Sequence, residues 1–176
     1  METSRFKPSF TVIGSILAFI LQVSLAPNIA ILDVVPNFIL VFVVLNAMFS
    51  PQIRSCFTGF FLGFLYDCVS HAALGTMSFV LTIIGYAVSS LNKDLFTGSW
   101  AIQTFYLLIA ALFGELLHAT FLSILGVDND FLLSLGMRVL PGTIYDALFG
   151  LIVFPIMARS KGSKRKDSGL LKGKYS

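Results

Sequence analysis

Charged residues are scarce in this chain. Aspartate, glutamate, lysine and arginine together make up 12% of 176 residues, whereas hydrophobic residues make up 56%, and the mean hydropathy is +0.88. A soluble globule of this length cannot bury so much apolar surface. The shortage of charge therefore excludes a soluble protein and indicates an integral membrane protein.

Cysteine is scarce as well, because the chain contains only Cys56 and Cys68. The two lie twelve positions apart on one expected helix, about 18 Å along its axis, so they cannot form a disulfide with each other. We interpret both as apolar side chains inside the protein.

Recognisable catalytic motifs are missing too. The sequence has no phosphate-binding loop and no nucleophile elbow, and neither cysteine has a base placed to activate it. We therefore expect no enzymatic activity, no cofactor and no metal.

Apolar runs are what the chain does contain, and we interpret six of them as membrane-spanning helices. They cover residues 10–25, 36–49, 54–69, 77–91, 100–125 and 140–158. The first run could also be a cleaved secretory signal, since Ser24-Leu25-Ala26 resembles a cleavage site, but its length and the runs that follow favour an uncleaved span. The prediction is an all-α bundle of six transmembrane helices over residues 1–158.

Lysine and arginine are distributed unevenly over the connections of this six-span arrangement. Eleven of the twelve lie on one side: Arg5, Lys7, Arg54, Lys93 and seven between Arg159 and Lys174. Cytoplasmic loops carry such an excess, so both termini are expected in the cytoplasm. Residues 159–176 form a basic tail that we expect to be disordered unless bound. Attraction to anionic lipid is its simpler role, docking of a cytoplasmic filament is the alternative, and nucleic acid is not expected.

The stretch at residues 57–67, FTGFFLGFLYD, has two different helical faces. Gly59, Gly63 and Asp67 lie on one narrow face, and the opposite face is aromatic, with Phe57, Phe60, Phe61 and Phe64. Small residues at this spacing let another backbone approach closely. The glycine face could serve ordinary packing or binding to a partner protein. Asp67 favours a specific role, because an ionisable group at the end of a membrane helix needs a partner or water.

Glu115 and His118 stand at i and i+3 on the fifth run, a spacing that in paired copies builds di-iron sites. Only one copy is present, so a buried polar pair is the simpler interpretation, with Glu115 accepting a hydrogen bond from His118 or from a neighbouring span. A proton relay through Glu115, Asp146 and Asp67 is conceivable, although nothing in the sequence suggests a cycle to drive it.

Arg138 is the one basic residue on the outer side, just ahead of Pro141 and of a turn at residues 140–146 that we expect to open the last span. It could pair with Asp67, with Asp33 or with an outer partner protein. Alternatively, it is a rim residue that reaches lipid headgroups.

Several short motifs occur in a characteristic order, and each is weak alone. They are Pro36-Asn37 at the start of a span, GFFLGFLYD at residues 59–67, Leu74-Gly75, Gly85-Tyr86 and LPGTIYDAL at residues 140–148. Pro36 suits a first helical turn, and Asn37 can serve the free backbone groups there. In this order the chain resembles the bacterial rod shape-determining protein MreD family, from the first span to Pro155. That family more often has Pro-Asp at residues 36–37 and Tyr-Asn at residues 145–146, so the buried polar pairing is expected to be rearranged here.

The resemblance implies a scaffold of the cell-elongation machinery in the bacterial inner membrane. Implied partners are a single-span MreC-like protein, the MreB filament, and the RodA and penicillin-binding synthases of peptidoglycan. The expected contact surface combines Pro36, Asn37, Gly59, Gly63, Asp67, Gly75, Arg138, Pro141, Tyr145 and Asp146. The family is also similar in fold to S-components of energy-coupling-factor transporters, which makes a vitamin-binding subunit the alternative.

Overall fold

The computed structural model describes residues 8–31, 34–70, 73–95, 100–127 and 131–162. The described chain is helical, apart from one bridged pair between Ile31 and Val34. This confirms the predicted all-α architecture. In order, the elements are α1 (Pro8–Ser24), the 3-10 turn η1 (Ala26–Ile29), α2 (Phe38–Phe49), α3 (Gln52–Val69), α4 (Thr76–Leu95), α5 (Trp100–Ile124), α6 (Phe131–Ser134), the π-helical turn η2 (Leu135–Val139) and α7 (Leu140–Gly162). The predicted disordered tail lies mostly outside the described residues, and α7 continues to Gly162, past the expected end at 158.

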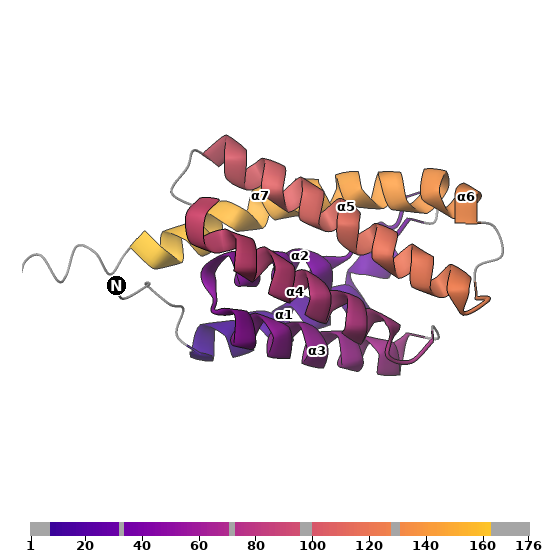
Figure 1. Cartoon of the computed structure of the whole chain (residues 1–176), viewed down its shortest axis with the longest axis horizontal. Coiled ribbons are helices and arrows are strands. Elements are labelled where there is room, and N and C mark those ends of the chain that lie inside the picture. Colours follow the sequence, from indigo (N-terminus) through magenta and orange to yellow (C-terminus); the bar gives the residue numbers. More distant parts are fainter. Residues whose placement is uncertain (1–7, 32–33, 71–72, 96–99, 128–130, 163–176) are drawn as a thin grey trace, which may run out of the picture.

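Helix α2 lies in the centre of the bundle. Eleven of its twelve residues are buried, and α1, α3, α4, α5 and α7 all pack against it (Figure 1). A helix that is apolar on every side is buried in protein or in a membrane, and here other helices surround α2. The run FILVFVVLNAMF therefore accounts for the central position of α2.

Two described helical stretches have the length and composition of membrane spans, Thr104–Ile124 and Phe131–Pro155. Shorter apolar helices cover Ser9–Ser24, Phe38–Phe49 and Thr76–Leu91. With twelve residues, α2 is about 18 Å long, less than the roughly 30 Å of a bilayer core. The count of six spans stays a prediction.

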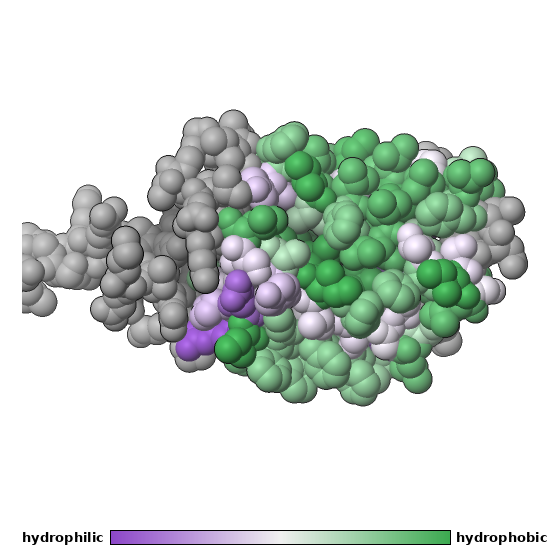
Figure 2. Space-filling view, viewed as in Figure 1, coloured by the Kyte–Doolittle hydropathy of each residue, from purple (hydrophilic) through white to green (hydrophobic). Residues whose placement is uncertain are grey.

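The outer surface of the bundle is strongly apolar (Figure 2). Large hydrophobic side chains are exposed along α1, α3, α5 and α7, among them Ile13, Ile16, Phe57, Phe61, Phe105, Phe113, Ile144 and Ile152. A soluble monomer rarely exposes an apolar patch of such extent. Lipid is the solvent that suits this surface.

The backbones of α3 and α4 come into direct contact through glycine. A Cβ atom added to Gly63 would lie 2.5 Å from the backbone nitrogen of Ser78, and one added to Gly59 would collide with the carbonyl of Leu81. From the other side, a Cβ on Gly85 would lie 2.8 Å from the carbonyl oxygen of Ser55. This confirms the predicted close approach and identifies the neighbour as α4 of the same chain.

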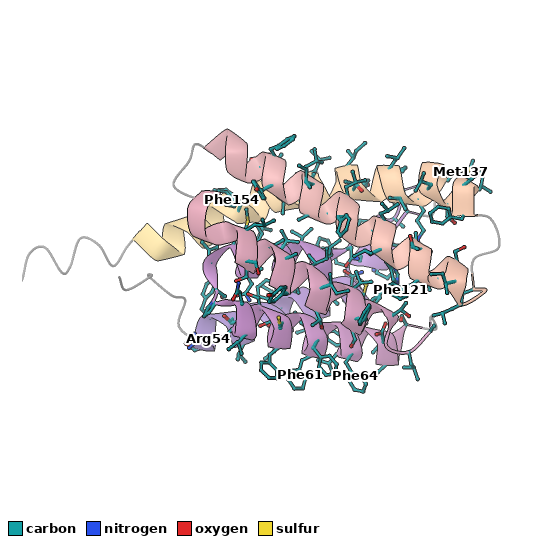
Figure 3. The ribbon with its side chains drawn as sticks, in the orientation of Figure 1. Arg54, Phe61, Phe64, Phe121, Met137 and Phe154 are labelled. Carbon is teal, nitrogen blue, oxygen red and sulfur yellow. The ribbon has the colours of Figure 1, made fainter. Side chains whose placement is uncertain are left out.

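The four phenylalanines of α3 face outward, as predicted. We call Phe57, Phe60, Phe61 and Phe64 the phenylalanine face; their exposed fractions lie between 47% and 60%. Figure 3 shows Phe61 and Phe64 pointing away from the bundle. The two faces of α3 therefore have separate roles, one in packing against α4 and one in contact with the surroundings.

The last long helix differs from the prediction. The helical stretch that contains it begins at Phe131, nine residues before the expected start, although α7 itself begins at Leu140 as expected. Residues 140–146 are helical rather than a turn. Pro141 has no N–H to donate to the carbonyl four residues back. The chain accommodates it by widening to a π-helical turn just before it, where the Leu140 N–H donates to the Leu135 carbonyl. The proline thus changes the helix locally without ending it.

Candidate functional site

Asp67, at the end of α3, caps the start of α4. It is 1% exposed. Its Oδ2 accepts hydrogen bonds from the backbone N–H groups of Gly75 (3.1 Å) and Ser78 (3.0 Å), and its Oδ1 accepts one from Met77 (3.2 Å). A carboxylate favours the N-terminus of a helix because the first N–H groups there have no partner within the helix. The partner that Asp67 was expected to need is thus the backbone of α4.

Gly75 makes this cap possible. Its φ is +91°, a conformation that residues with a Cβ rarely adopt. The turn places the Gly75 N–H on Asp67 directly ahead of the helix. Asp67 and Gly75 therefore have a structural role within the chain.

We expect Asp67→Ala to lower the free energy of unfolding by about 2 kcal/mol, the upper range for loss of a helix cap, because three backbone donors lose their acceptor. Thermal unfolding in detergent measures this effect. Cys68→Ala changes the next residue, which is exposed rather than inside the protein as expected, and should be close to neutral. Equal effects from the two variants would contradict a capping role for Asp67.

Asn37 is the centre of a second polar cluster, at the start of α2. Its Oδ1 accepts from the Leu40 N–H (3.1 Å) and so caps α2, as predicted. Its Nδ2 donates to Glu115 Oε1 (2.9 Å), and its backbone N–H donates to Asp146 Oδ1 (2.7 Å). Asn37 thereby links the start of α2 to Glu115 of α5 and to Asp146 of α7. Pro36 lies ahead of this cap, outside the first helical turn in which it was expected.

Gln22 of α1 completes this cluster and was not singled out from the sequence. Its Nε2 donates to the Pro36 carbonyl (3.2 Å), and its Oε1 accepts from the Ile39 N–H (3.4 Å). The available signal was one amide side chain within an otherwise apolar run. Four helices therefore meet through polar side chains at the start of α2.

The two positions at which the resemblance implied a departure from the usual residues are in contact with each other. They are Asn37 and Asp146, 109 positions apart in sequence and joined by a hydrogen bond. Asp146 is 1% exposed, and its second oxygen, Oδ2, has no partner among the described residues. The two residues thus form one contact, and rearrangement of the polar pairing stays a prediction.

Glu115 accepts its hydrogen bond from a neighbouring helix, one of the two options predicted. His118 lies one turn away on α5 and is 7% exposed. No group of three or more His, Cys, Asp or Glu side chains that could hold a metal occurs in the part of the chain that the structure describes. Asp67 is bonded to α4, whereas Asn37 bridges Glu115 and Asp146, so the three carboxylates do not form one connected chain.

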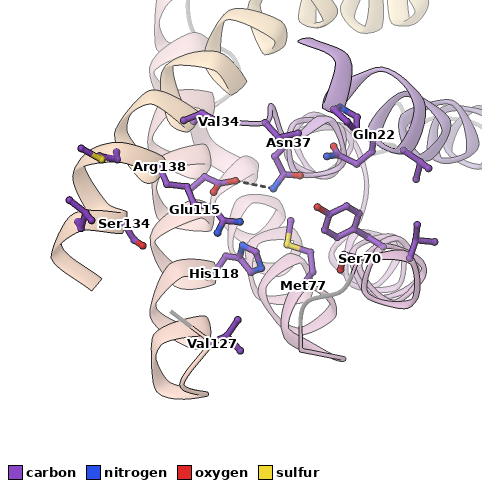
Figure 4. A pocket seen from close by; sticks show the side chains of 18 residues that line it. Gln22, Val34, Asn37, Ser70, Met77, Glu115, His118, Val127, Ser134 and Arg138 are labelled. Atoms are coloured by element: carbon purple, nitrogen blue, oxygen red, sulfur yellow. Dashed lines mark hydrogen bonds between the residues drawn. The ribbon is translucent and has the colours of Figure 1, made fainter. Parts of the chain in front are cut away.

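A cavity of about 810 Å³ opens at the end of the bundle that contains this cluster. Every long helix except α2 contributes to its wall, and α2 takes part only through its N-cap residue Asn37. The lining residues include Gln22, Asn37, Tyr66, Met77, Glu115, His118, Met137, Arg138 and Gly142. Figure 4 shows Glu115, His118 and Arg138 directed toward the same space. The cavity is large enough for a small molecule or a lipid headgroup.

Arg138 lies in the π-helical turn η2 and lines the cavity. Its side chain is directed toward the same space as Glu115 and His118 (Figure 4). It does not pair with Asp67, whose oxygens are both bonded to α4, and Asp33 lies outside the described residues. Arg138 is thus exposed beside the cavity, and a role at the rim or on an outer partner protein stays a prediction.

Half of the ten residues of the expected partner surface are buried, whereas Gly75 and Arg138 are exposed. Pro36, Gly59, Gly63, Asp67 and Asp146 are buried within the chain. Tyr145 is half-buried, and its hydroxyl donates to the Ile29 carbonyl (3.5 Å). The residues recognised from sequence therefore contribute to two structural clusters and to part of a cavity, and their role in binding a protein partner stays a prediction.

Comparison with known families gives one match. The model of the rod shape-determining protein MreD family matches residues 4–159. Searches of the curated proteins and of the solved structures found no match.

Proposed function

Because this chain belongs to the rod shape-determining protein MreD family, a family of bacterial membrane proteins, we propose that it serves rod shape as a scaffold of the inner membrane. In this proposal it binds a single-span MreC-like partner. Through that partner it supports the RodA and penicillin-binding synthases of peptidoglycan and, directly or indirectly, the MreB filament.

The phenylalanine face is the observation that carries this proposal. It belongs to a helix whose opposite side packs mainly against α4. Its rings are ordered along the helix: the centroids of Phe57 and Phe61 are 6.4 Å apart, and those of Phe60 and Phe64 are 6.3 Å apart. Association of helices in lipid depends on close van der Waals packing. A row of aromatic ridges supplies a shape into which a partner helix with small residues can fit.

The ends of the described chain support the proposed orientation. Pro8 at the start of α1 and Gly162 at the end of α7 lie at the same end of the bundle in Figure 1. A chain that crosses the membrane an even number of times has both of its ends on the same side. With the basic residues on the cytoplasmic side, the cavity lies at the outer surface of the membrane.

Affinity purification in mild detergent tests the scaffold proposal. We expect the wild-type chain to copurify with an MreC-like protein. The Phe57→Ala/Phe61→Ala double variant should retain about tenfold less of that partner, because two aromatic anchors of the interface are removed. Ile13→Ala/Ile16→Ala is the matched control, since both isoleucines are exposed on α1. An equal loss in the control would contradict the assignment to the phenylalanine face.

Depletion of the protein in a rod-shaped host is the corresponding test in cells. Rounded cells, with the MreC-like partner still produced but mislocalised, are the expected result. Unchanged shape would contradict the scaffold proposal.

The cavity favours one alternative, a substrate-binding S-component of an energy-coupling-factor vitamin transporter. A pocket of about 810 Å³ with polar groups in its interior is typical of small-molecule sites. In that case the protein should copurify with ATPase subunits and a vitamin, and its depletion should produce a vitamin requirement.

A further inference from the structure

The cavity contains a cation and a carboxylate that do not pair with each other. Arg138 enters from η2 and Glu115 from α5. Their charges are close enough to interact, but no ion pair joins them in the described part of the chain. Glu115 uses Oε1 on Asn37. Groups of both signs are therefore presented to one space.

The exposed lining of the cavity is largely apolar apart from Arg138, and its buried wall carries polar groups beside Val34 and Met77. Glu115 and His118 are buried at 8% and 7% exposure, whereas the lining residues Val35, Leu133 and Met137 are exposed at 43%, 55% and 68%. A ligand that matches this wall has a charged head and an apolar body. A soluble ion or sugar would leave these exposed apolar side chains uncovered.

The position of the cavity along the bundle is that of lipid headgroups. It is lined where α1 ends, α2 begins, α3 ends and α4 begins, with Val23, Asn37, Val69 and Met77. The ends of membrane helices lie at the headgroup layer, outside the hydrocarbon core. A lipid can thus place its head in the cavity while its chains remain among the exposed apolar side chains at the mouth.

We propose that this cavity binds the headgroup of a zwitterionic phospholipid with a primary ammonium group, its phosphate on Arg138 and its ammonium on Glu115. The planar guanidinium suits two phosphate oxygens at once, and a carboxylate accepts hydrogen bonds from an ammonium. A headgroup with negative charge alone supplies no cation for Glu115, whose one hydrogen bond is to the neutral Asn37 amide, and would be repelled by it. A quaternary ammonium has no N–H to donate.

Native mass spectrometry of the full-length protein in detergent tests this proposal. After delipidation, we expect one phosphatidylethanolamine to bind, about tenfold more tightly than phosphatidylglycerol or phosphatidylcholine, a difference of one charge-assisted hydrogen bond. Equal binding of all three lipids would overturn the proposal. Soluble phosphoethanolamine should compete only weakly with the lipid for the cavity, because it lacks the apolar chains. If it displaced the lipid at equal concentration, the ligand would be a soluble molecule instead.

Variants connect the binding to the two charged residues. Arg138→Gln should reduce retention of phosphatidylethanolamine about tenfold. Glu115→Gln keeps an oxygen for Asn37 and should remove the preference over phosphatidylglycerol. Arg54→Gln is the matched control, because Arg54 lies at the opposite end of the bundle (Figure 3). If it weakened binding as much as Arg138→Gln, the site would lie elsewhere.

A second variant blocks the cavity without changing charge. A Cβ on Gly142 would be 3.7 Å from Val34 Cγ1, an ordinary contact, so Gly142→Leu can fold and fill the space. Its thermal midpoint should stay near that of the wild type while one bound lipid is lost. Full retention of the lipid in this folded variant would exclude the cavity as the site.

Discussion

Gly63→Leu is expected to destabilise the bundle by about 3 kcal/mol or more, the upper range for overpacking a close contact. A Cβ atom at this position lies 2.5 Å from both the backbone nitrogen and the Cα of Ser78. Backbone atoms cannot move aside as a flexible side chain can. The leucine must therefore push α3 and α4 apart and disturb the Asp67 cap at their common end.

Thermal unfolding in detergent or a steric-trap assay in lipid measures this loss. Phe61→Leu is the matched control on the same helix, because Phe61 is 59% exposed and should change stability by less than about 0.5 kcal/mol. Gly63→Ala should already be harmful, since the clash arises at Cβ. If Gly63→Leu were as stable as Phe61→Leu, that result would contradict the close contact between the α3 and α4 backbones.

Asn37→Asp is expected to cost about 3 kcal/mol, the low end for an uncompensated buried charge. The new carboxylate replaces the Nδ2 donor that binds Glu115 Oε1, so oxygen faces oxygen. It also lies beside Asp146, which already accepts the residue 37 backbone N–H. Three carboxyl groups would then share one buried site, although the cap on Leu40 could still form.

A second substitution should rescue Asn37→Asp. Asp146→Asn returns the number of carboxyl groups to two, and Glu115→Gln supplies a donor for the new carboxylate at position 37. We expect either to recover at least half of the lost stability, and Asp146→Asn alone to be mild, since an asparagine oxygen can still accept from the backbone N–H of residue 37. A double-mutant cycle measures the coupling. Strictly additive effects would mean that residues 37, 115 and 146 do not act as one cluster.

The helices were predictable because their signal is local. Apolar runs located α1 to α5 to within a few residues, and the spacing of Gly59 and Gly63 indicated a face for close approach. The continuation of the helix through Pro141 was missed, because proline normally ends or kinks a helix. Whether a π-helical turn absorbs it depends on packing along the whole length of the helix.

By itself, the sequence determined the chemical class of this protein: an apolar, helical chain with few charges, suited to a bilayer, whose motifs indicate the family that the comparison with known families shows. Composition and helical spacing are properties of neighbouring residues, so they can be read along the chain. Only the tertiary structure decided what the polar residues do. It placed Asp67 on the start of α4, joined Asn37 to Asp146 across 109 positions, and brought Arg138 and Glu115 to one cavity. Such contacts depend on the distances between packed helices, which no local pattern encodes.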